Sequence, residues 1–399
     1  MTSLLRPLRG VIALSLGAVV AIAFGRFAYA LVLPAMRADL GLDYGEAGAL
    51  NTANALGYLA GALVCTRYVA RLGNRRLFSI GLPLMVLALL ASGATRSFAA
   101  QLCWRALAGV AGAMVYICGA VLASNAFPGR SDRASTAIGV YFCGAGAGML
   151  LAGAGIPTLL AVAGDSAWRE AWLAIGGVSV LFAFVALRAA RAIDEPQPTP
   201  RRARWPIRRY TASLASYFLF GIGYNAYMTF VVALMRSHGA SLLQVASTWV
   251  VLGLASVLSP IAWRIPRARW HPSKIQAAAS LVISVGAAMP LFSTSFPAML
   301  LSATLFGGAM FTIPTAATDL VKASLPRAAW GSAVAVLTVA FAVGQTIGPV
   351  LTGWLADRTH SLGAGLALSV VLLLAAGGVA LAQPDRGALR IRASLRAAE

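Results

Sequence analysis

Two arginines stand inside long apolar segments of this sequence. Arg26 interrupts a run that begins near Val11 and continues past Leu33, and Arg105 lies in the apolar run 98–125. A guanidinium stays protonated at any ordinary pH, and its planar fork of donors matches a carboxylate or a phosphate. Placing such a charge at membrane depth costs about 2.5–3.5 kcal/mol on insertion-based scales. Both arginines are therefore candidate ligands for an anion.

The segments that hold these arginines belong to a strongly apolar chain. Of its 399 residues, 59% are hydrophobic and 11% are charged, whereas soluble domains hold about 25% charged residues. A segment of about 20 apolar residues crosses the hydrocarbon core as a helix. Breakers and charged connections divide the chain into twelve such segments, which predicts an all-α membrane protein with twelve transmembrane helices. The predicted spans are 11–35, 46–66, 77–95, 98–125, 134–160, 169–187, 210–235, 243–263, 274–292, 297–320, 329–356 and 362–382.

The basic residues gather on one side of this arrangement. With the N-terminus inside, 25 of the 32 Lys and Arg residues lie in cytoplasmic segments, five lie in outer loops and two lie within spans. This bias follows the positive-inside rule and predicts a multi-pass protein of the cell (inner) membrane with both termini cytoplasmic. The net charge of +20 is spread over short connections. Because it does not form one face of a soluble domain, nucleic acid is not an expected partner.

The chain divides into two similar halves. A basic, proline-containing segment at 188–209 predicts a cytoplasmic linker between a six-helix half at 1–187 and a second at 210–399, which ends in a short cytoplasmic tail. Six spans separate the two copies, and because six is even, both halves cross the membrane in the same sense. At an offset of 198 residues the matches include Gly25 with Gly223, Tyr29 with Tyr227, and Gly109 with Gly307.

The repeat separates the arginines from the scaffold. The equivalents of Arg26 and Arg105 in the second half are Tyr224 and Ala303, so the repeated fold does not itself demand a cation at either position. Small residues, in contrast, line one face of the fifth and of the eleventh span. They include Gly144, Gly148, Gly344 and Gly348, and we expect them to pack the two halves closely together.

Twelve spans in two parallel halves joined by a basic linker resemble the major facilitator superfamily. The connection after the second span, "RYVARLGNRRLF", is similar to the family's Gly-x-x-x-Asp-Arg-x-Gly-Arg-Arg loop, although Ala70 replaces the usual Asp. The fourth span reads "RALAGVAGA", close to the family pattern Arg-x-x-x-Gly-x-x-Gly-Ala. The stretch 25–63 resembles the YbfB/YjiJ-type branch. The resemblance implies gating or coupling roles for Arg71, Gly73, Arg75, Arg76, Gly109 and Gly112.

The resemblance also implies that the first, fourth, seventh and tenth spans line a central cavity, which would bring Arg26 and Arg105 together. No Asp or Glu lies in the middle of any span. Either a bound anion supplies the missing counter-charge, or backbone carbonyls, tyrosine hydroxyls and water satisfy the two guanidiniums. The predicted substrate-binding residues are Arg26, Tyr29, Arg105, Tyr116, Tyr224, Asn225 and Tyr227.

Two further polar groups have structural interpretations. Asn51, Asn54 and Tyr58 form a stripe on the second span, which favours hydrogen bonds between helices. Asp319 lies at the cytoplasmic boundary of the tenth span, where we expect a gate or loop contact, with proton carriage as the alternative.

These patterns predict a secondary transporter that works as a monomer in the lipid bilayer by alternating access and moves a small organic anion. The alternatives are proton-coupled efflux of amphipathic compounds and a non-transporting membrane sensor or scaffold. Protons are a candidate coupling ion. Enzyme signatures are missing, so no catalytic residue, metal site or cofactor is predicted, and the partner is a small-molecule substrate.

Overall fold

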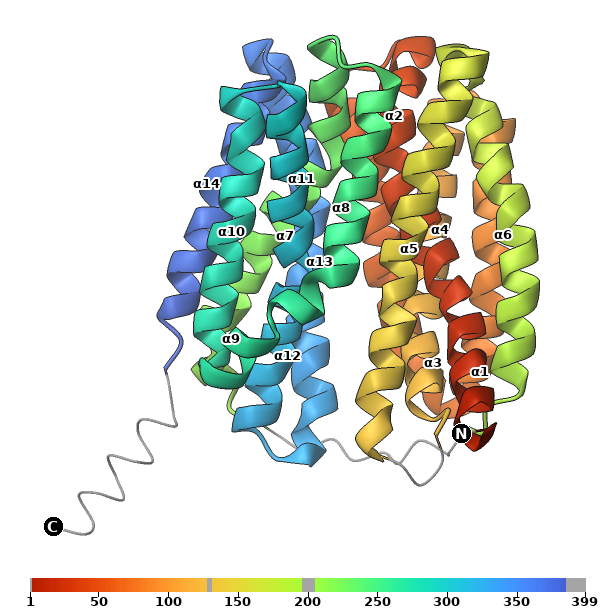
Figure 1. The fold of residues 1–399 in the computed structure, drawn as a ribbon, viewed down its shortest axis with the longest axis vertical. Helices are drawn as coiled ribbons and strands as arrows, with labels where there is room; N and C mark the ends of the chain where they lie inside the picture. Colours follow the sequence, from red (N-terminus) through yellow and green to blue (C-terminus); the bar gives the residue numbers. More distant parts are fainter. Residues whose placement is uncertain (1, 128–130, 196–204, 385–399) are drawn as a thin grey trace, which may run out of the picture.

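The computed structural model describes residues 2–127, 131–195 and 205–384. The regular structure of these residues is helical, and the long helices stand side by side as a bundle (Figure 1). Eleven of the described helices are long and apolar enough to cross a membrane. These observations confirm the predicted all-α membrane fold. Parts of the predicted linker and tail, residues 196–204 and 385–399, lie outside the described residues.

The helices form two groups, one on each side of the bundle in Figure 1. The first group comprises α1 (Thr2–Ala18), the π-helix η1 (Val19–Phe27), α2 (Ala28–Leu40), α3 (Tyr44–Ala94), α4 (Phe98–Ser124), α5 (Ser131–Ala163), the 3-10 turn η2 (Asp165–Ala167) and α6 (Trp168–Arg191). The second comprises the 3-10 turn η3 (Ile207–Tyr210), α7 (Thr211–Ser237), α8 (Leu242–Ala262), α9 (Arg264–Arg269), α10 (Pro272–Phe292), α11 (Phe296–Met310), α12 (Thr312–Ser324), α13 (Arg327–Thr359) and α14 (Leu362–Leu381).

Helix α3 contains two spans. Its 51 residues would extend about 76 Å if straight, more than twice the roughly 30 Å hydrocarbon core. The helix breaks at Gly73, whose φ of 78° and ψ of 161° suit only glycine. Gly61, before the break, and Gly81, after it, both lie against the segment 110–115 of α4. The chain therefore folds back at Gly73, and α3 supplies the second and third of twelve spans.

The bundle has two distinct ends. The linker end carries the N-terminus and the C-terminal end of α6 (Figure 1). The distal end carries the short connections 41–43, 95–97 and 238–241.

The small-residue faces of α5 and α13 pack inside the groups and not between them. Gly144 lies against the backbone of Ser15 in α1, and Gly344 lies against that of Phe218 in α7. The expectation that these faces join the two halves was wrong. The groups instead meet through other small residues, such as Gly146 against α8 and Gly48 against Pro349, because a hydrogen side chain allows two backbones to approach closely.

Candidate substrate site

A π-helical segment interrupts the first span where Arg26 lies. The nine residues of η1 are all buried, and such wide turns inside α-helices are frequent at functional sites. The carbonyl of Gly25 is turned toward neighbouring helices, where it accepts hydrogen bonds from Arg105 Nη1 at 2.9 Å and Asn54 Nδ2 at 3.3 Å. The π-helical segment thus links the backbone beside Arg26 to α3 and α4.

Arg105 is enclosed by protein groups, with only 1% of its surface exposed. Besides the bond to Gly25, its Nη2 lies 3.5 Å from Asn51 Oδ1. Its guanidinium carbon is 4.7 Å from the ring centre of Tyr29 and 5.7 Å from that of Trp172, distances at which an aromatic face attracts a cation. Its Nε has no partner among the described residues, but both terminal nitrogens are bonded, so the surrounding helices use this guanidinium as an internal contact.

Arg26 is less completely satisfied. Its exposed fraction is 7%, its Nη2 makes a long contact of 3.5 Å with Asn225 Oδ1, and its guanidinium lies 5.7 Å from the ring centre of Tyr58. Its Nε has no hydrogen-bond partner among the described residues, and no carboxylate in the described chain pairs with it. Its Nη1 also makes no hydrogen bond with the described residues and, unlike Nε, is not fully enclosed, so Arg26 keeps one terminal donor free for a ligand.

Asn225 joins the two helix groups beside Arg26. Its Oδ1 also receives Asn51 Nδ2 at 3.4 Å, and its own Nδ2 donates to the Gln345 carbonyl at 2.8 Å. Asn51 also donates to Thr229 Oγ1. The Oε1 atom of Gln345 is buried without a partner in the described chain. This amide network holds α3, α7 and α13 together at the level of Arg26.

The four predicted tyrosines have different surroundings. Tyr29 donates to the Ala47 carbonyl at 2.7 Å and covers Arg105. Tyr227 shares a 2.6 Å hydrogen bond with Ser302 and stacks on Phe306 at 4.1 Å.

The other two predicted tyrosines are open to a ligand. Tyr224 packs edge-on against Phe27, the neighbour of Arg26, and Tyr116 stacks on Phe142 at 4.9 Å. Neither hydroxyl has a hydrogen-bond partner in the described part of the chain, and neither is fully enclosed. Arg26, Asn225 and Tyr224 therefore form the centre of the candidate site, and the roles of the other predicted residues toward a substrate stay predictions.

The loop after the second span, at the linker end, is held by a residue that the sequence analysis did not single out. Glu195, just beyond α6, accepts hydrogen bonds from the backbone N–H groups of Asn74 and Arg75, the latter at 3.0 Å. Arg75 also donates to the Ile193 carbonyl. A carboxylate at a helix N-terminus is favourable, so Glu195 caps the third span in the loop where Ala70 replaces the family's Asp.

The remaining predicted gating residues occupy three kinds of place. Arg71 and Arg76 are exposed at the linker end. Gly109 lies against the α3 backbone at Asn54, whereas Gly112 lies less tightly against the side chains of Met85 and Tyr58. Asp319 forms an ion pair with Arg267 of α9 at 2.8 Å, which is a loop contact within the second group.

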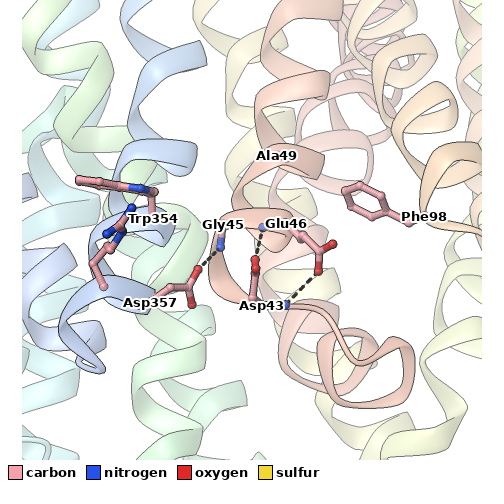
Figure 2. Close-up of a pocket in the computed structure, with 8 residues that line it drawn as sticks. Asp43, Gly45, Glu46, Ala49, Phe98, Trp354 and Asp357 are labelled. Atoms are coloured by element: carbon pink, nitrogen blue, oxygen red, sulfur yellow. Dashed lines mark hydrogen bonds between the residues drawn. The ribbon is translucent and has the colours of Figure 1, made fainter.

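The distal end is closed by contacts between the two groups. Asp357 of α13 accepts hydrogen bonds from the N–H groups of Tyr44 at 3.0 Å and Gly45 at 2.7 Å, the first residues of α3. Figure 2 shows this carboxylate directed at Gly45, beside Asp43 and Glu46, in an open groove of about 580 Å³. Two more contacts support the closure: Thr52 donates to the Thr346 carbonyl at 2.7 Å, and Arg236 pairs with Asp165 at 3.3 Å.

Solved structures of transporters share this fold. A crystal structure of a bacterial homologue of the human lysosomal transporter Spinster, inward-facing and unoccupied, matches with a TM-score of 0.69 and 16% identity, covering 94% of this chain and 97% of that one. A mutant of the nucleoside transporter NupG matches with a TM-score of 0.74 and 11% identity, covering 94% and 98%. The chain therefore has the fold of the major facilitator (MFS) transporters.

The sequence defines the family within this fold. Residues 18–381 match the family model described as "Uncharacterised MFS-type transporter YbfB", and the chain belongs to that family. Two proteins of Bacillus subtilis (strain 168) are similar over most of their length. The uncharacterized transporter YycB is 24% identical over 86% of this chain and 85% of its own, and the uncharacterized MFS-type transporter YceJ is 23% identical over 86% and 88%. The protein is a multi-pass membrane transporter and not an enzyme.

Proposed function

We propose that this protein is a secondary transporter that moves a small organic anion by alternating access. The observation that carries the proposal is the state of Arg26, a buried guanidinium whose Nε and Nη1 have no hydrogen-bond partner and which pairs with no carboxylate among the described residues. Burying a charge without a partner is costly. A substrate carboxylate would supply the counter-charge and accept two parallel hydrogen bonds.

Arg105 supports the site without touching the substrate. Its guanidinium binds the Gly25 carbonyl and lies between two aromatic rings, so we propose that it positions the η1 segment and adds positive potential to the site. Tyr29 then acts through Arg105. This division of roles makes Arg26, Asn225 and Tyr224 the groups that touch the substrate.

Alternating access needs two units that rock about the central site. We propose residues 1–187 and 210–399 as these units, with 188–209 as the connection. The contacts of Asp357, Thr52 and Arg236 close the distal end. We further propose that the protein is a monomer in the inner membrane with its N-terminus in the cytoplasm. In this orientation the contacts close the outer side, and outward opening requires Asp357 to release the start of α3.

The test is uptake into proteoliposomes, with and without a pH gradient, for a panel of small organic anions and lipophilic cations. We expect anion uptake that is lost in Arg26→Ala and kept in Arg188→Ala, a matched loss of charge at the linker end of α6. Cation transport that is unaffected by Arg26→Ala would overturn the anion proposal and favour proton-coupled efflux of amphipathic compounds. Absence of any solute movement would favour a sensor or scaffold.

A further inference from the structure

Four tyrosine hydroxyls near Arg26 are left without partners. The hydroxyls of Tyr29, Tyr141, Tyr210 and Tyr227 all make hydrogen bonds. Among the described residues, those of Tyr58, Tyr116, Tyr217 and Tyr224 make none, and they are not fully enclosed either. Because a hydroxyl inside a membrane protein needs a partner, these four groups must face water or a ligand.

Contacts connect the four tyrosines. Tyr58 lies beside the Arg26 guanidinium and against Gly112, one helical turn before Tyr116. Tyr217 and Tyr224 both pack against Phe220 and Phe341. Counted from the distal helix ends at 1.5 Å per residue, Arg26, Tyr58 and Tyr224 are about 20 Å deep, and Tyr116 and Tyr217 are about 27–30 Å deep. The four rings therefore extend from Arg26 toward the linker end, on the side away from the distal closure.

Further aromatic rings pack beside these tyrosines. Tyr217 stacks on Phe341 at 4.8 Å, Phe341 stacks on Phe220 at 5.4 Å, and Tyr224 lies 5.3 Å from Phe220. Flat rings favour another flat ring in an offset or edge-on arrangement. Their faces carry partial negative charge, so they disfavour an anionic group placed against them.

We propose that Tyr58, Tyr116, Tyr217 and Tyr224 together with Arg26 form a binding site for an aromatic monocarboxylate. The carboxylate binds Arg26, whose Nη1 has no partner among the described residues and is not fully enclosed, and the aromatic ring packs among the tyrosine and phenylalanine rings. A second carboxylate would lie against ring faces and would not reach Arg105, which is enclosed. The inference rests on the proposed function, since it names the anion that the same site takes.

Equilibrium binding of radiolabelled benzoate to the purified full-length protein in detergent tests this inference. We expect saturable binding that phenylacetate displaces and that succinate, terephthalate and benzyl alcohol do not. Arg26→Ala should weaken binding at least about tenfold, because a charge-assisted pair is lost. Tyr224→Leu should weaken it several-fold, whereas Tyr68→Phe, which alters an exposed tyrosine, should leave it unchanged.

The outcomes separate this inference from the proposed function. If benzoate fails to bind while uptake of an aliphatic anion depends on Arg26, the aromatic monocarboxylate is wrong and the anion transporter stands. If terephthalate displaces benzoate with the same potency as phenylacetate, the restriction to one carboxylate is wrong. If benzoate binding is the same in Arg26→Ala, both proposals are overturned. If Tyr224→Leu does not fold, Tyr224→Phe replaces it in the binding test. Loss of the hydroxyl alone should still weaken benzoate binding.

Discussion

Arg105 and Arg26 are both arginines at membrane depth, but their surroundings differ. The first makes structural contacts, and the second is the proposed ligand for the substrate. Arg105 is covered by Tyr29 and Trp172 and bonded to the Gly25 carbonyl. Arg26 lies at the junction of the helix groups, with one long bond from Nη2 to Asn225 and no partner for Nη1 among the described residues, whereas both terminal nitrogens of Arg105 are bonded and the Nε of each arginine is unpartnered. Burial alone does not distinguish them. The difference lies in how many donors the protein itself satisfies, because unsatisfied buried donors are where a ligand gains affinity.

Replacing Arg26 should have the largest effect. Arg26→Ala should lower initial anion uptake in proteoliposomes at least about 100-fold, because the transported charge loses its counter-charge at the site. Its unfolding temperature in detergent should stay the same or rise, since an underpaired buried charge is removed. If the Arg26→Ala protein shows normal uptake at equal reconstituted amounts, Arg26 does not bind the substrate and the contrast with Arg105 fails.

Arg105→Ala should act on stability instead. Deleting the guanidinium removes the bond to Gly25 and leaves a cavity between Tyr29 and Trp172, which should lower the free energy of unfolding by about 2–4 kcal/mol. Denaturant unfolding in detergent measures this, with Arg26→Ala as the control. Equal losses of stability in the two variants would show that both arginines are structural.

A smaller effect is expected at the distal end. Asp357→Asn keeps the shape of the side chain but removes the charge that faces the N-terminus of α3, which should weaken the closed state by about 0.5–2 kcal/mol. In a background without the four native cysteines, spin labels at Ala38→Cys and Thr359→Cys should report a larger fraction of long distances. An unchanged distance distribution would mean that Asp357 does not hold this end closed.

The smallest effect is expected at the linker end. Glu195→Gln should lower the free energy of unfolding by about 0.5–1 kcal/mol, since the neutral amide caps the third span less well. Asp194→Asn, at the exposed neighbouring position, is the matched control for thermal unfolding. If the two variants unfold at the same temperature, Glu195 does not stabilise the protein by capping the third span.

The fold could be read from the sequence because membrane burial acts on each span separately. Apolar length, charged connections and the repeat between Gly25 and Gly223 each report on a local or periodic property. The same reasoning brought Arg26, Tyr224 and Asn225 into one candidate site. It misassigned the glycine faces of α5 and α13, since small size indicates close packing but does not name the partner helix.

Other parts of the site could not be read in this way. Gln345, Thr229 and Glu195 look like ordinary polar residues in the sequence, and nothing in their spacing connects them to Arg26 or to the loop after the second span. Asn51 was noticed as part of a polar stripe, but its bonds to Asn225 and Thr229 cross between helix groups. Such contacts depend on how the helices are rotated about their axes.

By itself the sequence determined a twelve-span membrane transporter of the major facilitator class with two cations at membrane depth, because hydrophobicity, charge bias and motifs are properties of the chain. Only the tertiary structure decided that both terminal nitrogens of Arg105 are bonded, whereas Nη1 of Arg26 has no partner among the described residues. That difference depends on which carbonyls and rings reach Arg105 and which do not reach Arg26. Hydrogen-bond satisfaction is a property of neighbours in space, and the neighbours of these arginines come from helices far apart in the chain.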